Sequence, residues 1–347
     1  MKAHIYRNIQ SRKGSILILV LVVTAILTSM AFSLAYRCRI ELKLAGSSSQ
    51  QMKLYYLAYG GIQRCLALLS QEELDPKLTL KVAHFLSSEK QEQLFGSLDQ
   101  NIEDTTSLVY WIVDENSYLS LNNSDPSCWE NTKLLDRAQI ASILDWSDTD
   151  NDTNPEGAES DYYERIEPPT TCKNAPILSL KELLHIKGIS SELYSNSFAS
   201  IFSGYSTDSD IADFQEAMRL DEHMNLHRFF SVYGDGKINI NTVPHHILSI
   251  LPGLDVSTAD TLLAHRSGPD RLMGTEDDSC IKNVSDIGLI DALSELEVEL
   301  LQQYCNFNSD IFRIYSYAKK NKHDFLLMAT VRVIENKPTI ITIERLL

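Results

Sequence analysis

The sequence SILILVLVVTAILTSMAFSLAY, at residues 15–36, decides the fold because it contains no charged residue. At a rise of about 1.5 Å per residue, a helix of this length crosses a hydrocarbon core of about 30 Å. Backbone groups in lipid must be satisfied within the segment, so we expect a transmembrane helix. The polar leader before it carries Lys2, Arg7, Arg12 and Lys13, which favours a cytoplasmic amino terminus and an outward-facing body.

Three interpretations of this stretch are open. A cleaved secretory signal has an apolar core of about 7–15 residues before a small-residue site, and the core here is longer, although Ser33 and Ala35 fit such a site. A plain single-span anchor is the second interpretation. The third rests on Gly14, which stands between the basic leader and the apolar run and resembles the glycine of type IV prepilin leaders. We rank the prepilin interpretation first because the rest of the chain agrees with it.

The composition limits the remaining classes of function. With 347 residues, the chain has room for one membrane helix and one or two folded modules. The net charge of −16 is concentrated in the acidic segment 145–167, which would repel nucleic-acid phosphates and suits divalent cations. We therefore expect no nucleic-acid partner.

The cysteines do not fall into any CxxC pair, which argues against a zinc ribbon or a thioredoxin-like site. Disulfide bonds are chemically allowed if the body lies outside the inner membrane, and buried free thiols are an equal alternative. The six cysteines are Cys38, Cys65, Cys128, Cys172, Cys280 and Cys305.

Periodicity predicts a helix followed by strands. Apolar residues recur at helical spacing over 37–69, so the membrane helix should continue as an amphipathic helix that packs on a sheet. Gly60 and Gly61 cost that helix about 1–2 kcal/mol, which predicts close packing there. The strands expected from aromatic and β-branched residues are 107–113, a partner strand at 118–121, a strand or hairpin at 229–241, and an antiparallel meander formed by 312–318, 325–334 and 339–345.

The acidic loop DWSDTDNDTNPEGAESDYY, at residues 145–163, is the strongest candidate site. Crowded carboxylates are mutually destabilising unless a cation neutralises them, and calcium takes 6–8 oxygen ligands. The spacing departs from an EF-hand, and a solvated acidic loop is the alternative. The predicted calcium ligands are Asp145, Asp148, Asp150, Asp152, Glu159 and Asp161, with Glu156 nearby. A second calcium site is predicted from Asp270, Glu276, Asp277 and Asp278.

Two stretches resemble helix-hairpin-helix units, at 178–190 and 243–266. Such hairpins contact phosphates in DNA-binding proteins, but the basic residues here are few, mainly Lys187 and Arg266, so we interpret the pattern as helix packing. His245 and His246 project to different sides of a helix and are not expected to share a metal. The sequence contains no Gly-rich phosphate loop, G-x-S-x-G or H-E-x-x-H motif, so we expect no enzyme.

The order of elements, Gly14, and the stretches DWSDTDNDTNPEGAESDYY, LSLKELLHIKGI and YGDGKININTVPHHILSILPG together resemble the K-type minor pseudopilin of type II secretion systems (GspK). The resemblance implies an α+β, type IV pilin-like fold, in which a long amino-terminal helix packs on an antiparallel sheet, with a large helical insertion containing helix-hairpin-helix-like units. The expected segments are a prepilin leader (1–14), a transmembrane half-helix (15–36), an amphipathic helix with the first strands (37–123), the helical insertion (124–306) and a β-meander (307–347).

The resemblance also implies a function. The chain would be a non-enzymatic subunit at the tip of the pseudopilus, assembled with I- and J-type minor pseudopilins, anchored in the inner membrane with its body in the periplasm, and loaded with calcium. Prepilin peptidase would cut after Gly14, and Ser15 would become the methylated amino terminus. Most subunits of this superfamily carry glutamate five residues after the cut, where this chain has Leu19. A subunit at the filament end has no next subunit whose ammonium group needs that carboxylate.

A type IV pilus minor pilin and a membrane-anchored DNA-uptake protein are the alternative functions. The large acidic insertion disfavours the first, and the shortage of basic residues at the hairpins disfavours the second.

Overall fold

A computed structural model describes residues 13–70, 106–194, 226–271, 277–320 and 323–346. The predictions for the first twelve leader residues, for the polar stretch before the first strand and for Glu276 lie outside the described residues. The chain forms two compact units, Met1–Lys53 and Leu54–Leu347.

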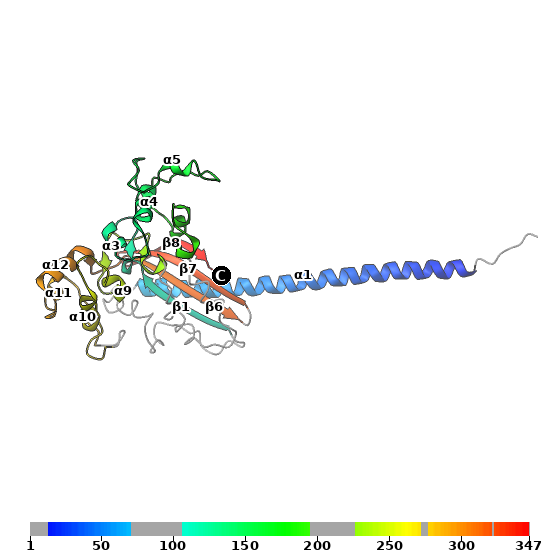
Figure 1. The fold of residues 1–347 in the computed structure, drawn as a ribbon. Coiled ribbons are helices and arrows are strands. Elements are labelled where there is room, and N and C mark those ends of the chain that lie inside the picture. The colour runs from blue at the N-terminus through cyan, green and yellow to red at the C-terminus, as the bar shows by residue number, and fades with distance from the viewer. Residues whose placement is uncertain (1–12, 71–105, 195–225, 272–276, 321–322, 347) are drawn as a thin grey trace, which may run out of the picture. The chain divides into compact units, whose positions relative to one another are not determined.

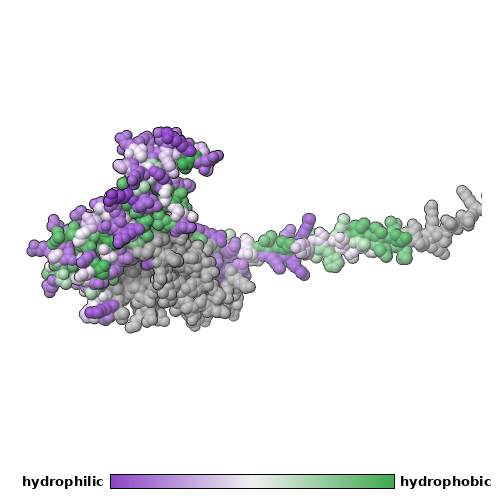
Figure 2. All heavy atoms as spheres, in the orientation of Figure 1, coloured by the Kyte–Doolittle hydropathy of each residue, from purple (hydrophilic) through white to green (hydrophobic). Residues whose placement is uncertain are grey.

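Helix α1 (Lys13–Leu69) confirms the predicted continuation of the membrane helix into an amphipathic one. Within the described part of the chain it contains the one stretch that is long and apolar enough to cross a membrane. Its apolar side chains between Ile16 and Tyr36 are exposed, as lipid-facing residues are, and Figure 2 shows this part of α1 as a continuous hydrophobic surface.

A four-stranded antiparallel sheet forms the frame of the second unit (Figure 1). Its order is β1 (Thr106–Asp114), β6 (Ile311–Lys320), β7 (His323–Ile334) and β8 (Lys337–Arg345). The predicted first strand and carboxy-terminal meander are therefore confirmed. Because β1 pairs with β6, everything between them is an insertion into one sheet.

The last turns of α1 cover one face of this sheet. Leu54, Ala58, Ile62, Cys65 and Leu69 are buried against residues of β1, β6 and β7. The predicted close packing occurs at the second glycine of the pair, where a Cβ would clash with the Ser316 hydroxyl oxygen. A Cβ at the first glycine would meet nothing within 4 Å. These contacts confirm that the amphipathic half of α1 packs on the sheet.

The other face of the sheet carries Trp111 and Tyr315, whose rings stack with their centroids 5.0 Å apart. The insertion has its own hydrophobic core, which includes Trp129, Ile143 and Leu301. It is built from short elements: α3 (Pro126–Glu130), α4 (Arg137–Ser147), α5 (Ser160–Tyr163), η2 (Leu180–His185), α6 (Ser191–Tyr194), η3 (Leu226–Arg228), β3 (Phe230–Ser231), β4 (Ile238–Asn239), α9 (His245–Leu248), α10 (Val256–Arg266), α11 (Val284–Ile287), α12 (Glu295–Tyr304) and β5 (Cys305–Asn306). The predicted α+β fold with a helical insertion is confirmed.

Two local pairing predictions were wrong. After the short helix η1 (Glu115–Ser117), β2 (Leu119–Ser120) does not return along β1 but pairs in parallel with β3 of the insertion. The stretch 229–241 contains the strands β3 and β4 but is no hairpin, because β3 pairs with β2 and β4 pairs with β5. In both cases a distant segment supplied hydrogen bonds that local sequence patterns do not reveal. The first helix-hairpin-helix-like stretch does form a helical unit, in which η2 is followed by a turn at Gly188 (φ 81°) and by α6.

The six cysteines, all within the described residues, form no disulfide bond with one another in this structure, so the disulfide alternative is not supported.

Candidate metal centre

Helix α4 positions two of the predicted ligands. It begins with a capping box, in which Asp136 and Gln139 satisfy each other's backbone amides at 2.8 Å. It ends at Ser147, so Asp145 lies in its last turn and Asp148 is its C-cap. Both carboxylates therefore emerge from the same end of one rigid element.

The loop that follows α4 folds back over Asp145. Asn154 donates to Asp145 Oδ1 from its backbone amide at 3.1 Å and from its side-chain amide at 2.6 Å. Gly157 lies so close that a Cβ would clash with Asp145 Oδ2. The ring of Trp146 meets Tyr163 edge-on, with centroids 5.1 Å apart, and so fixes α5 beside α4. The return of the chain brings Glu159, the N-cap residue of α5, to Asp145.

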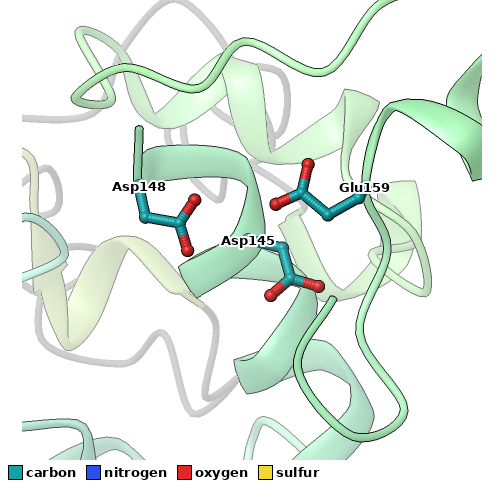
Figure 3. Close-up of side chains that lie close together, drawn as sticks. All are labelled: Asp145, Asp148 and Glu159. Carbon is teal, nitrogen blue, oxygen red and sulfur yellow. The ribbon is translucent and has the colours of Figure 1, made fainter. Parts of the chain in front are cut away.

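Asp145, Asp148 and Glu159 form what we call the carboxylate cluster: each offers an oxygen within 4.8 Å of the oxygens of the other two. Figure 3 shows the side chains of Asp148 and Glu159 extending toward each other on either side of Asp145. Asp145 is fully buried and Glu159 is 3% exposed, while Asp148 is partly exposed. Within the described residues, this is the one group of at least three acidic, histidine or cysteine side chains with such spacing.

Four of the six carboxylate oxygens in the cluster lack hydrogen-bond donors. Asp145 Oδ2, Asp148 Oδ1 and both carboxylate oxygens of Glu159 are shielded from solvent without a hydrogen-bond partner. Burial raises the pKa of Asp148, and the charges of Asp150 and Asp145 raise it further. Burial likewise raises the pKa of Glu159, and the charges of Asp148 and Asp145 add to the effect. Buried carboxylates whose charges are not neutralised destabilise the fold, so this geometry favours a bound cation.

The donor set fits a hard divalent cation. The four unpartnered atoms are all carboxylate oxygens, which calcium and magnesium prefer over nitrogen or sulfur. Calcium accepts irregular geometry and bidentate carboxylates, whereas magnesium demands a near-ideal octahedron. Asp145, Asp148 and Glu159 would hold the ion, and water would complete its coordination.

The other predicted ligands of this loop lie outside the cluster. Asp150 Oδ1 accepts the backbone amide of Asp152 at 2.9 Å, so it stabilises its own turn. Asp161 forms an exposed ion pair with Arg165 at 3.3 Å. Glu156 has a positive φ of 70° and presents its backbone carbonyl to Lys187. The prediction of six ligands was therefore too broad, because i+2 spacing in a turn points side chains in different directions.

The second predicted site is not assembled among the described residues. Asp277 Oδ2 accepts the backbone amide of Asp270 at 3.2 Å, and the charge of Asp278 acts on the buried guanidinium of Arg266. Thus the described members of this group have loop-closing and charge-pairing roles.

The basic residues that would have served DNA binding are committed within the fold. Arg266 is buried and donates to the carbonyls of Ile240 and Val243 at 3.2 and 2.8 Å. Lys187 donates to the carbonyls of Glu156 and Gly157. These two basic side chains are therefore engaged by backbone carbonyls of the insertion.

The adjacent histidines face different partners, as predicted. His245 Nε2 lies 3.0 Å from Asp260 Oδ1, and His246 Nε2 lies 3.0 Å from the carbonyl oxygen of Arg228. Burial lowers the pKa of His246, which keeps that ring neutral at pH 7.

The processing and filament residues lie on α1. Gly14 and Ser15 belong to its first turn, and Leu19 is 64% exposed further along the helix. Their roles stay predictions.

Residues 130–197 match the family model of type II secretion system (T2SS), protein K, and this match contains the entire carboxylate cluster. A search of curated proteins found no match. Among solved structures, the chain resembles one from the crystal structure of the GspK-GspI-GspJ complex of the enterotoxigenic Escherichia coli type 2 secretion system, with 12% sequence identity and a TM-score of 0.55. The alignment covers 86% of this chain and 98% of that one, so the two share a fold over most of their length.

Proposed function

We propose that this chain is a GspK-type minor pseudopilin of the type II secretion system, and that it occupies the tip of the pseudopilus and acts there without catalytic activity. The observation that carries the proposal is the match of residues 130–197 to protein K, since this segment holds both the start of the insertion's core and the carboxylate cluster. A bulky insertion on a pilin-like sheet suits the end of a filament, where no further subunit must stack.

We propose I- and J-type minor pseudopilins as the partners. The structural relative was crystallised in a complex with GspI and GspJ, and the shared fold supports the same assembly here. The apolar half of α1 supports a single span in the inner membrane, with the body in the periplasm. Prepilin peptidase would cut after Gly14, and Ser15 would become the methylated amino terminus of the mature subunit.

Calcium would have a structural role in the insertion. By bridging Asp145 and Asp148 on α4 to Glu159 at α5, it would replace carboxylate repulsion with coordination and fix the acidic loop. An ion that binds only the folded chain stabilises that chain by mass action. The insertion would therefore be at full stability only in a calcium-containing compartment.

The proposal is tested by co-expressing the full chain with the I- and J-type minor pseudopilins of the same secretion system and purifying the tagged chain in detergent. We expect the two partners to co-purify with it and Gly14→Ala to retain the leader while still inserting into the membrane. Normal leader removal in Gly14→Ala would contradict the prepilin assignment. Failure of both partners to co-purify with the processed chain would contradict the tip complex.

A further inference from the structure

Lys187 lies just after η2, and its side chain contacts the acidic loop that follows α4. It follows η2, 24 or more residues after the loop, and its side chain is half-buried. Its ammonium nitrogen lies 3.0 Å from the carbonyl oxygen of Glu156 and 2.9 Å from that of Gly157. It also lies 5.2 Å from the centroid of the Tyr162 ring, within the range of a cation–π contact.

The backbone around Lys187 is tied to the same region. The Lys187 amide donates to the Tyr163 hydroxyl at 3.2 Å, and the Gly188 carbonyl accepts from the Gln139 side chain at 2.7 Å. The turn at 187–188 is thus fastened both to α5 and to the start of α4. The backbone of Lys187 is therefore held in place, so its ammonium group can restrain the loop, which a lysine on a mobile surface segment could not do.

The two carbonyls that Lys187 binds, those of Glu156 and Gly157, are close in sequence to Glu159 of the carboxylate cluster. Gly157 lies against Asp145, where a Cβ would clash, and Glu159 follows two residues later. Glu156 adopts a positive φ of 70°, an unfavourable conformation for a residue with a side chain, and its carbonyl is one of the two that Lys187 binds. The contacts of Lys187 therefore fix the backbone that carries Glu159 toward Asp145.

We infer that Lys187 is a positioning residue for the cation site: it holds the 156–159 backbone in the shape that keeps Glu159 with Asp145 and Asp148 when no ion is bound. This inference rests on the proposed calcium site. Lys187 supplies no ligand and touches the ion only through the loop. The positive charge of Lys187 repels a bound cation, but two backbone carbonyls partly neutralise that charge. We therefore expect the ordering of the loop by Lys187 to favour ion binding more than this repulsion opposes it. Loss of the two charge-assisted hydrogen bonds should weaken calcium binding by about tenfold.

The test is a calcium titration by isothermal calorimetry on the full chain in detergent, at a temperature well below unfolding. Lys187→Met removes the ammonium group and keeps the length of the side chain. Arg165→Met is the matched control, since Arg165 lies two residues after the acidic loop and pairs only with the exposed Asp161 among the contacts described. We expect Kd to rise about tenfold in Lys187→Met and less than about twofold in Arg165→Met. Lys187→Arg, which keeps a charged donor, should recover most of the affinity.

Amide hydrogen exchange in chelator gives a second readout. Lys187→Met should lose protection over 154–160 while the strands of the sheet keep theirs, and Arg165→Met should not. An unchanged or lower Kd in Lys187→Met would overturn the inference, as would unchanged exchange in the loop. The wild-type titration alone tests the calcium proposal, because absence of calcium binding by the wild-type chain would overturn that proposal.

Discussion

Asp114 and Asp145 are both buried aspartates at the end of a regular element, and their surroundings are opposite. Asp114, at the end of β1, accepts the amide of Asn116 on one oxygen and hydrogen bonds from Asn239, Thr242 and Ser309 on the other, at 2.6–3.2 Å. Asp145, at the end of α4, has two donors from Asn154 on one oxygen and none on the other, and its carboxylate lies near those of Asp148 and Glu159.

The difference shows that burial of a carboxylate does not by itself indicate a metal. At Asp114 the protein provides the donors, and the carboxylate links the sheet to β4 of the insertion and to Ser309, two residues before β6. At the carboxylate cluster four oxygens have no donor from the protein, and a cation is the missing partner. The count of donors, rather than the count of acids, separates the two regions.

Asp114→Ala gives the largest expected loss. It removes the shared acceptor of Asn239, Thr242 and Ser309. Asn239 keeps Ser309 Oγ as an acceptor and Thr242 keeps only the distant Asn239 carbonyl, and a buried donor left unpaired costs about 1–3 kcal/mol. We expect a loss of about 2–4 kcal/mol in the free energy of unfolding by denaturant, equal in calcium and in chelator. A loss that appeared only in calcium would contradict the separation between the two regions.

The pH dependence of stability tests Asp114 in its native form. Burial raises its pKa to about 6 from 3.8, despite its hydrogen bonds. Because the folded pKa is the higher one, the folded protein holds this proton more tightly. The contribution of this proton to the free energy of unfolding is therefore complete below about pH 4, and it is lost as the pH rises to about 6.

The matched comparison for that pH dependence is Asp114→Asn, which does not titrate. The stability of the wild type relative to this variant should fall by about 3 kcal/mol from pH 4 to pH 7, measured by urea unfolding in chelator. A constant difference across this range would show that Asp114 is ionised throughout.

Glu159→Gln and Asp148→Asn test the carboxylate cluster with side chains of nearly unchanged shape. In calcium at 100 times its Kd, the wild type should be about 2.7 kcal/mol more stable than in chelator, and either variant should lose most of that increment. In chelator the variants should match or exceed the wild type, since removing one charge relieves the repulsion that raises the pKa of the other carboxylate. Equal destabilisation in both buffers would mean that these residues stabilise the fold without an ion.

Asp161→Asn should have the smallest effect. Its carboxylate is in the same acidic loop but pairs with Arg165 at the surface, and exposed pairs contribute less than about 1 kcal/mol. We expect no resolvable change in calcium affinity by calorimetric titration. A marked loss of affinity would place Asp161 in the ion's coordination sphere and restore the broader ligand set.

The sequence predicted the features that depend on the periodicity of short segments or on the order of the elements along the chain. The uncharged run at 15–36 and the alternating strands at the carboxy terminus are patterns of residues close in sequence. The glycine pair in α1 predicted close packing there, but Ser316, the distant residue against which Gly61 packs, was not visible in that pattern. The pairing of β2 with β3 and of β4 with β5 depends on residues more than 60 positions apart, and local patterns do not encode it.

The candidate site was predicted in composition but not in detail. Crowded acids indicated a cation, yet i+2 spacing alone could not separate Asp150, which stabilises its own turn, from Asp148, which joins the cluster. The supporting roles of Asn154 and Lys187 depend on the folded loop. For Lys187, its place beside Gly188 in a hairpin-like turn was visible in the sequence, but the carbonyls it binds were not.

Differential scanning calorimetry of the full wild-type chain in detergent, with calcium and with chelator, tests the central claim most directly. The carboxylate cluster predicts that calcium raises the melting temperature of the folded body by roughly 5–10 °C. Identical melting curves in the two buffers would contradict the claim and leave the cluster as a group of buried acids that folds without a cation.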